Sequence, residues 1–391
     1  MTVPSFFRFH VLLALFSITA IIPVQSKETF LRKVEDIVIY SETNFHSAFP
    51  SIVRRPDGEL IVAFRRAPDR RIFGEKKYTH TDANSYLYLT RSRDEGKNWS
   101  DPKMFFADPF GGSQDPCLLQ LRDESLLCAT YGWSPMNSNN IAQMKKPVML
   151  GAHGFVFMGG SLIRSEDGGK SWGKQFFPPP TPISDRLDIF GKPLPSFNRG
   201  AMCEGRDGRI FWVVAAHDPT SAKTTTHLMI SEDKGATWKY SCPVAFDSKM
   251  IFNETSIYET PRGDLLAFIR TENNNGVSVV ARSTDGGKSF QPWQSLGFIG
   301  LPLHAMRLPD SRVLLTYGHR AKPFGIRARV LDPECTNVTT AREIILREDG
   351  GNHDIGYTWS SMISKQRVLV TYYFNIADGP RHIAGTILEL E

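Results

Sequence analysis

Cysteine is scarce in this sequence, and metal-binding spacings are missing. The 391 residues include five cysteines: Cys117, Cys128, Cys203, Cys242 and Cys335. An odd and sparse set is not a disulfide framework, although one or two bridges are compatible with it and cannot be assigned. No spacing of cysteine, histidine and carboxylate residues is typical of a structural zinc site. We therefore predict no metal ligands and no cofactor, while a stabilising calcium ion is left open.

An excess of charge of one sign is also missing. Lysine and arginine total 46, against 41 aspartate and glutamate residues, which gives a formal net charge of +5. Such a small excess shows no basic stripe of the kind that nucleic-acid binding requires, so we expect no nucleic-acid partner. It does permit a mildly positive cleft for an anionic ligand.

Long apolar runs are confined to the N-terminus. Arg8 and His10 precede the apolar run 11–22, and residues 24–26 form a plausible cleavage site. This pattern predicts a signal peptide over 1–26, and a secreted or periplasmic mature chain over 27–391. The run is shorter than the roughly 20 residues that span a bilayer comfortably; an uncleaved anchor is the alternative. No later stretch could cross a membrane, so we expect no stable membrane insertion after cleavage. The oligomeric state is not predicted.

One short motif occurs four times. The copies read SRDEGKNW, SEDGGKSW, SEDKGATW and STDGGKSF, and they begin at Ser92, Ser165, Ser231 and Ser283. A catalytic motif is normally needed once, so four copies indicate a repeated structural unit. The aspartate can accept hydrogen bonds from its own turn, the glycine can adopt a positive φ, and the aromatic residue can pack back onto the fold.

A second pattern occurs six times. An extended segment leads into a turn, and a mostly apolar run begins three residues after a fixed turn position. The turn positions are Asp57, Asp123, Asp207, Arg262, Asp310 and Lys365. Six such hairpins, each with room for two more strands, predict an all-β fold: a six-bladed β-propeller of four-stranded blades in a single domain over 27–391. A long β-sandwich or two all-β domains are the alternatives.

The four-fold motif then has a place in each blade. It follows the hairpin turn by some 20 to 40 residues, where a third strand would turn into a fourth. The fifth blade has only a remnant near 331–333, and the sixth has none. We expect the strands around 34–40 and 383–390 to pair in one blade and close the ring, which removes exposed sheet edges.

These repeats resemble those of the sialidase (neuraminidase) superfamily, also called BNR or Asp-box proteins, and the resemblance covers nearly all of the mature chain. It implies an exo-α-sialidase activity, in which a tyrosine activated by a glutamate acts as the nucleophile, an aspartate acts as the acid/base, and three arginines hold the substrate carboxylate. By this resemblance Tyr357 is the nucleophile, Glu254 is its partner and Asp82 is the acid/base; Asp69 is a weaker candidate for that role.

The resemblance also implies substrate-binding residues. Arg270 matches one of the three arginines, and Arg320 or Arg327 is a candidate for another. The family's first arginine, in an Arg-Ile-Pro motif, is replaced here by Ala48 in Ala48-Phe49-Pro50. Arg65 or Arg66, at the end of the first hairpin, is a candidate replacement, and His46 is another. The bidentate bond of that arginine to a carboxylate would be lost, which puts the substrate in doubt more than the fold.

Polar residues before the six hairpins complete the predicted pocket. They include Asp115, His304 and Asp354, which we expect at the propeller axis, and Asp354 could serve as a base. The long loops over 132–160 and 176–198 are expected to wall this pocket.

The function predicted from these residues is an exported exo-glycosidase that removes a terminal acidic sugar from a glycan. The alternatives are a polysaccharide lyase or a hydrolase of another acidic sugar on the same propeller, and a propeller that binds glycans without catalysis. The sequence does not give the sugar or the linkage.

Overall fold

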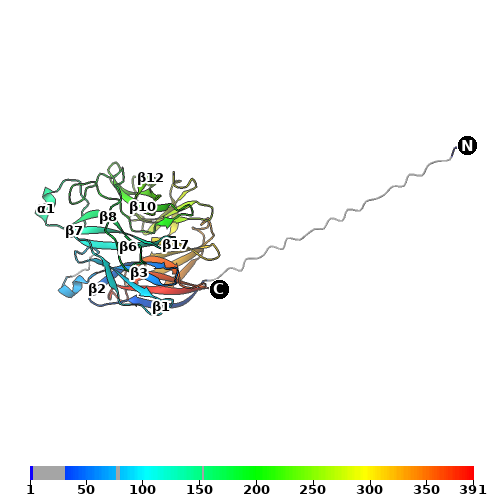
Figure 1. Ribbon diagram of the computed structural model, residues 1–391, viewed down its shortest axis with the longest axis horizontal. Helices are drawn as coiled ribbons and strands as arrows, with labels where there is room; N and C mark the ends of the chain where they lie inside the picture. Colours follow the sequence, from blue (N-terminus) through cyan, green and yellow to red (C-terminus); the bar gives the residue numbers. More distant parts are fainter. Residues whose placement is uncertain (3–30, 76–79, 152–153) are drawn as a thin grey trace.

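The computed structural model describes residues 1–2, 31–75, 80–151 and 154–391. The predicted signal peptide, 1–26, lies outside the described residues except for its first two positions. The described chain forms six antiparallel sheets, five with four strands and one with three (Figure 1). The predicted all-β, six-bladed propeller is confirmed. No helix among the described residues is long and apolar enough to cross a membrane.

Each blade is built from consecutive strands, except the sixth. The strands of blades one to three are β2 (Phe45–Arg54), β3 (Leu60–Pro68), β4 (Tyr86–Ser92), β5 (Lys103–Phe106); β6 (Gly112–Gln120), β7 (Leu126–Pro135), β8 (Phe155–Ser165); and β9 (Cys203–Glu204), β10 (Ile210–Asp218), β11 (Lys223–Ser231), β12 (Lys239–Ala245). Blades four and five contain β13 (Phe252–Glu259), β14 (Leu265–Thr271), β15 (Val277–Ser283), β16 (Gln294–Ile299); and β17 (Leu301–Arg307), β18 (Val313–His319), β19 (Gly325–Leu331), β20 (Glu343–Arg347).

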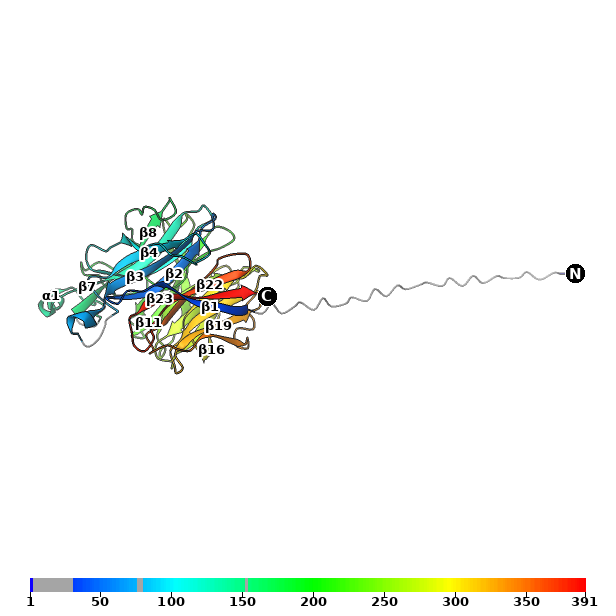
Figure 2. The same cartoon turned by 90° about the horizontal axis from the view of Figure 1, so that it is seen from below.

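The sixth blade closes the ring, as predicted. It contains β21 (Gly356–Met362), β22 (Arg367–Phe374), β23 (His382–Leu390) and, as its fourth strand, β1 (Leu31–Tyr40). β1 pairs antiparallel with β23, and Figure 2 shows the two ends of the described fold side by side. Because the first strand completes the last sheet, the ring cannot open without breaking a β-ladder.

All six predicted hairpins form, and they share one register. In the first blade Arg54 pairs with Leu60, three residues before and three after the turn position Asp57. The same offset relates Gln120 to Leu126 in the second blade, and it recurs in the other four. The first strands of neighbouring blades pack together: β2 contacts β6 and β21, and β17 contacts β13 and β21. These strands therefore surround the propeller axis.

Three of the four repeated motifs are turns between the third and fourth strands, as predicted, and the second copy is the turn that follows the third strand of its blade. In the second copy Asp167 Oδ1 accepts hydrogen bonds from the backbone N–H groups of Lys170 and Ser171, at 3.0 and 2.9 Å. Gly169 has φ +78°, where a side chain would be strained. In the third copy Trp238 packs against Trp212 of the same blade, with ring centres 5.3 Å apart. The motif is structural in every blade that has it.

The remnant of the motif in the fifth blade forms the same kind of hydrogen-bonded turn as the complete copies. Asp332 accepts hydrogen bonds from the backbone N–H groups of Glu334, Thr336 and Asn337, at 2.9 to 3.1 Å. Partial burial by itself would raise the pKa of Asp332, but bonds from the Thr336 hydroxyl and the backbone outweigh it, so this pKa lies below its ordinary value.

The lowered pKa of Asp332 makes a prediction about stability in acid. We expect Asp332→Ala to lower the free energy of unfolding by about 1 kcal/mol at pH 7, because the backbone N–H groups of a half-buried turn lose their acceptor. Because the pKa of Asp332 is lower in the folded protein than in the unfolded chain, the ionised carboxylate stabilises the fold above the unfolded pKa of about 3.9. This stabilisation is lost as the pH falls through the folded-state pKa. Urea unfolding should therefore show the difference shrinking from pH 6 to pH 3. An equal difference at both pH values would contradict this account.

Three details differ from or extend the sequence predictions. The second blade has three strands rather than four; its expected fourth strand is reduced to a single bridge between Leu162 and Phe176. Among the described residues one short helix, α1 (Ser138–Gln143), and one 3₁₀ turn, Arg70–Phe73, interrupt the strands. All five cysteines are free.

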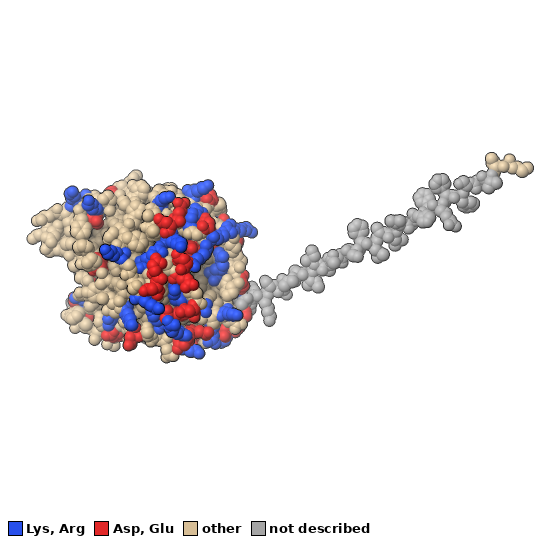
Figure 3. Space-filling view, in the orientation of Figure 1, with Lys and Arg blue, Asp and Glu red and all other residues tan. Residues whose placement is uncertain are grey.

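Acidic and basic side chains are mixed on the visible surface. Figure 3 shows acidic and basic side chains interspersed over one face, while the part of that face around α1 is largely uncharged. On this face no single sign of charge dominates, in keeping with the small net charge.

Candidate active site

The site is built on one position of the repeat. The innermost strands carry a β-bulge eight residues before the hairpin turn, where two residues oppose one on the partner strand. Phe49, Asp115 and Tyr357 occupy this bulge with φ of 58°, 42° and 55°. A bulge with a positive φ re-aims its side chain. The six residues at this position are Phe49, Asp115, Arg199, Glu254, Pro302 and Tyr357.

Tyr357 and Glu254 form a hydrogen-bonded pair across two blades. Tyr357 Oη donates to Glu254 Oε1 at 2.5 Å, and Arg270 Nη1 lies 2.9 Å from the other carboxylate oxygen. Burial, followed by the Glu254 charge, raises the pKa of Tyr357 well above its ordinary value, while Arg270 and Arg320 act in the opposite direction. The phenol is therefore neutral at rest, and Glu254 is placed to take its proton as the oxygen reacts.

Two more guanidinium groups lie against the Tyr357 ring. Arg320 Cζ is 5.2 Å from the ring centre, and its Nη2 donates to the Tyr373 hydroxyl at 3.0 Å. Arg199 Cζ is 5.1 Å from the same ring centre and 5.0 Å from that of Trp359. Positive charge from three blades thus surrounds the phenol, an arrangement that suits an anionic ligand.

Asp115 adds an acceptor to this surface. Its Oδ2 accepts a hydrogen bond from the Tyr131 hydroxyl at 2.8 Å, and its Oδ1 has no hydrogen-bond partner among the described residues. Burial raises the pKa of Asp115 to about 6, with the Arg199 charge opposing it. Asp115, Arg199, Glu254, Arg270, Arg320 and Tyr357 are called the axial cluster below.

Unpartnered polar atoms concentrate in and beside the axial cluster. The structure gives thirteen buried side-chain atoms without a hydrogen-bond partner among the described residues, and five of them lie here: Arg65 Nη2, Asp115 Oδ1, Arg199 Nε, Arg270 Nε and Glu254 Oε2, the last of which ion-pairs with Arg270. Buried polar groups are normally paired, so this concentration is typical of a site whose partners arrive with a ligand.

The first blade has Ala48 where the resemblance predicts an arginine, and Phe49 and Arg65 lie next to this position. Ala48 is fully buried and pairs in register with Arg65. Phe49 contacts the Tyr357 ring edge-on, with ring centres 4.7 Å apart. Arg65 Nε donates to Ser85 Oγ at 2.7 Å, so one edge of its guanidinium is fixed and buried.

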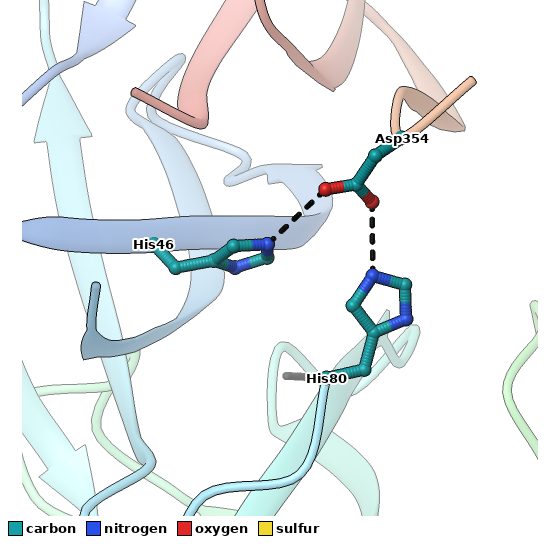
Figure 4. Close-up of side chains that lie close together, drawn as sticks. All are labelled: His46, His80 and Asp354. Carbon is teal, nitrogen blue, oxygen red and sulfur yellow. Dashed lines mark hydrogen bonds and ion pairs between the residues drawn. The ribbon is translucent and has the colours of Figure 1, made fainter. Parts of the chain in front are cut away.

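Asp354 is the centre of a second polar group, beside the axial cluster. Its Oδ1 accepts hydrogen bonds from Tyr373 Oη at 2.8 Å and from His80 Nε2 at 2.9 Å. Its Oδ2 accepts a bond from Arg381 Nε at 2.7 Å and lies 3.4 Å from His46 Nε2. Figure 4 shows the two imidazole rings approaching the carboxylate from different sides. Burial opposes ionisation of Asp354, but the bonds from His46 and His80 outweigh it and hold its pKa far below the ordinary value.

His46, His80 and Asp354 also satisfy the distance test for a metal site. Their ligand atoms lie within 4.8 Å of one another. However, Arg381 already occupies the carboxylate, and Arg65 Nη1 lies 3.3 Å from His46 Nδ1. Two guanidinium groups at contact distance repel a divalent cation, so the geometry fits a hydrogen-bonded network better than a metal centre.

The predicted acid/base residue is tied to a neighbouring arginine. Asp82 accepts two hydrogen bonds from Arg70, at 2.5 and 2.8 Å, and one from the backbone N–H of Asn84 at 2.8 Å. Its side chain is 1% exposed. Asp69, the weaker candidate, is ion-paired with Arg71 at 2.6 Å. Neither carboxylate has an oxygen directed at Tyr357 by a described contact.

Two other predicted residues have structural surroundings. His304 stacks on Trp359, with ring centres 4.8 Å apart, and accepts a hydrogen bond at Nδ1 from the backbone of Ser360 at 3.2 Å. Burial lowers the pKa of His304 to about 3, so the ring is neutral. Arg327 lies on β19, the third strand of its blade, and its Nε is 3.6 Å from Glu343. The described contacts of Arg327 do not bring it to the axial cluster.

Three residues of these networks, His80, Tyr373 and Arg381, had no role predicted from the sequence, and Arg199 was expected only as one of the polar residues before the six hairpins. The signal for Arg199 was available, because it precedes its turn position by the same eight residues as Glu254 and Tyr357. His80, Tyr373 and Arg381 carry no such signal, since they meet Asp354 through tertiary packing alone.

Comparison with known proteins places this geometry in a family. The family model for the BNR repeat-like domain matches residues 88–362. The chain belongs to this family. A solved structure of a protein of unknown function from Dyadobacter fermentans is 55% identical to this BNR-repeat protein, with a TM-score of 0.90, and covers 92% of this chain and 99% of its own. No curated protein matches the sequence.

More distant solved structures share the sialidase fold. A mutant of NanB sialidase from Streptococcus pneumoniae is 12% identical with a TM-score of 0.62, and the match covers 91% of this chain and 71% of that one. Trypanosoma rangeli sialidase in complex with sialic acid is 16% identical with a TM-score of 0.57, and the match covers 92% and 58%. At these identities the likeness concerns the fold, and it makes this BNR-repeat protein sialidase-like in architecture.

Proposed function

We propose that the protein is an exported retaining exo-glycosidase that hydrolyses a terminal acidic sugar from a glycan. The observation that carries the proposal is the 2.5 Å hydrogen bond between Tyr357 and Glu254, flanked by Arg270 and Arg320. An anionic sugar repels a carboxylate nucleophile, whereas a neutral phenol with an adjacent base avoids this repulsion.

In the proposed mechanism Tyr357 Oη attacks the anomeric carbon while Glu254 takes the phenolic proton. Arg270 and Arg320 bind the substrate carboxylate, and Asp115 Oδ1 accepts a hydrogen bond from a sugar hydroxyl. Water then displaces Tyr357 from the glycosyl-enzyme, and two displacements give net retention. The leaving oxygen also needs a proton donor, and by the resemblance this donor is Asp82.

A second candidate is a hydrolase or lyase acting on another acidic sugar, such as a uronate. Buried Ala48 favours it, because the first-blade guanidinium that the sialidase motif supplies is missing and Phe49 packs beside the nucleophile. A propeller that binds glycans without catalysis is the third candidate.

Product release from a fluorogenic sialoside tests the proposal directly. Release that Glu254→Gln abolishes supports a sialidase-type hydrolase. If the wild-type chain is folded but inactive on the sialoside, uronic-acid polysaccharides are the next substrates to test. Release of an unsaturated product that absorbs in the ultraviolet would then identify a lyase. Binding without product from either substrate class would contradict catalysis.

The carboxylate-binding role of Arg320 makes a separate prediction. We expect Arg320→Met to raise KM about 10- to 100-fold for the acidic substrate, the loss expected for a charge-assisted hydrogen bond. The same variant should barely change KM for the methyl ester of that substrate, because the ester lacks the charge. Arg312→Met, at an exposed turn of the same blade, is the matched control. A similar change for acid and ester would show that Arg320 only supports the fold.

A further inference from the structure

The loop that precedes β4 carries two candidate proton donors, His80 and Asp82, in different surroundings. Asp82 has both oxygens bound by Arg70 and is 1% exposed. His80 is 47% exposed, and its Nε2 is bound to Asp354. A general acid must reach the leaving oxygen of the substrate, so accessibility separates the two.

His80 is held firmly despite its exposure. Its Nε2 lies 2.9 Å from Asp354 Oδ1, and its backbone carbonyl accepts a hydrogen bond from Gln114 Nε2 at 2.7 Å. Its ring meets Phe49 edge-on, with centres 5.4 Å apart. Three contacts, with Asp354, Gln114 and Phe49, thus hold His80 in place, which is what a positioned catalytic group requires.

Phe49 connects His80 to the nucleophile. The Phe49 ring lies between them in the contact chain, 5.4 Å from His80 and 4.7 Å from Tyr357, centre to centre. An acid/base group of a retaining glycosidase stands several ångströms from the nucleophile, on the side of the leaving group. The Phe49 ring is therefore in contact with both the His80 ring and the Tyr357 ring.

We propose that His80 is the general acid/base of this glycosidase and that Asp354 is its positioning residue. This inference rests on the proposed function. Nε2–H is donated to Asp354 throughout, so Nδ1 exchanges the catalytic proton; Figure 4 shows Nδ1 turned away from the carboxylate. In a Ser-His-Asp triad, a carboxylate likewise accepts a hydrogen bond from one ring nitrogen of the catalytic histidine and so orients the ring.

The proton balance closes over two steps. In the first, Tyr357 Oη bonds to the anomeric carbon, Glu254 takes the phenolic proton, and imidazolium Nδ1–H protonates the leaving oxygen as the glycosidic bond breaks. In the second, neutral Nδ1 takes a proton from water, whose oxygen bonds to the anomeric carbon. The phenolate leaves and recovers its proton from Glu254. No co-reactant other than water is consumed.

Leaving-group dependence tests the assignment. We expect His80→Ala to lower kcat/KM for sialyllactose at least about 10²-fold, because the sugar oxygen needs a proton to leave. The same variant should lose less than about tenfold on an aryl sialoside, whose phenol leaves without one. Asp82→Asn should affect both substrates alike. Azide should speed turnover of the aryl substrate by His80→Ala, because an anionic nucleophile needs no base.

Three results would overturn the proposal. Equal losses on both substrates for His80→Ala, with unchanged thermal unfolding, would reduce His80 to a structural residue. A leaving-group effect in Asp82→Asn instead would return the role to Asp82. A wild-type chain inactive on both substrates would exclude sialic acid as the sugar of the proposed function, and would overturn the inference in this form. The conservative variant His80→Gln guards against local unfolding, since it keeps a donor to Asp354 but cannot carry the proton.

Discussion

Tyr357→Phe and Glu254→Gln are each expected to lower turnover at least about 10²-fold without unfolding the protein. The pKa of Tyr357 is raised well above its ordinary value by burial and by the Glu254 charge, so the phenol cannot ionise by itself at neutral pH. Without a positioned base the oxygen remains a weak nucleophile, and a positioned base contributes about 10² to 10⁴ in rate. Both variants keep the shape of the side chain they replace. Steady-state hydrolysis of the fluorogenic substrate measures the effect.

The loss should appear in kcat rather than in KM, because neither group is proposed to bind the ground-state substrate. Tyr240→Phe and Glu232→Gln are matched controls in the third blade: Tyr240 lies 3.5 Å from His227, and Glu232 is exposed. Both controls should retain wild-type turnover. Activity near that of the wild type in Tyr357→Phe would remove tyrosine as the nucleophile, and the bulge in the sixth blade would then need another explanation.

Arg381→Met is expected to lower the free energy of unfolding by about 3 to 5 kcal/mol, the cost of leaving one member of a buried ion pair uncompensated. Arg381 is 0% exposed and Asp354 2% exposed, and their atoms lie 2.7 Å apart. Arg381 also donates to the carbonyl of Gly379 and to the carboxylate of Asp378. Urea unfolding of the variant and the wild type measures the difference.

The pH dependence of this loss has a defined sign. The folded-state pKa of Asp354 is far below its ordinary value, so the ionised carboxylate contributes stability above about pH 4, and this contribution is lost as the pH falls below that. Arg381→Met should therefore destabilise most at neutral pH and less at pH 3 to 4. Adding Asp354→Asn to Arg381→Met should restore part of the stability at pH 7. Equal destabilisation at both pH values would point to lost packing rather than lost charge.

The propeller was predictable because its signals are local and repeated. An Asp-Gly-like turn with an apolar run three residues later needs only neighbouring residues, and the structure has the same register in all six copies. The turn at Asp332 was predicted as a remnant, yet it makes the same backbone bonds as the complete motifs. The missing strand of the second blade was not predicted, although Phe176 and Phe177 are followed by three prolines, which cannot donate hydrogen bonds to a β-ladder.

The axial cluster was predictable in part. Tyr357, Glu254, Arg270, Arg320 and Asp115 follow from the resemblance and from their place before or after a hairpin, and the structure brings them together. Arg327 was a candidate because it follows Arg320 closely, but strand alternation and the turn between β18 and β19 carry it into the blade. The roles of all these residues remain to be tested by the variants above.

By itself the sequence determined the number of blades, the closure of the ring and the repeat position from which the polar side chains project. Those properties depend on turn chemistry and periodicity, which act over a few residues. Only the tertiary structure decided which histidine meets which carboxylate. His46, His80, Tyr373 and Arg381 converge on Asp354 from segments far apart in the chain, and no local pattern specifies such a meeting. The pairing of Asp82 with Arg70 and the exposure of the His80 side chain were likewise not specified by any local pattern.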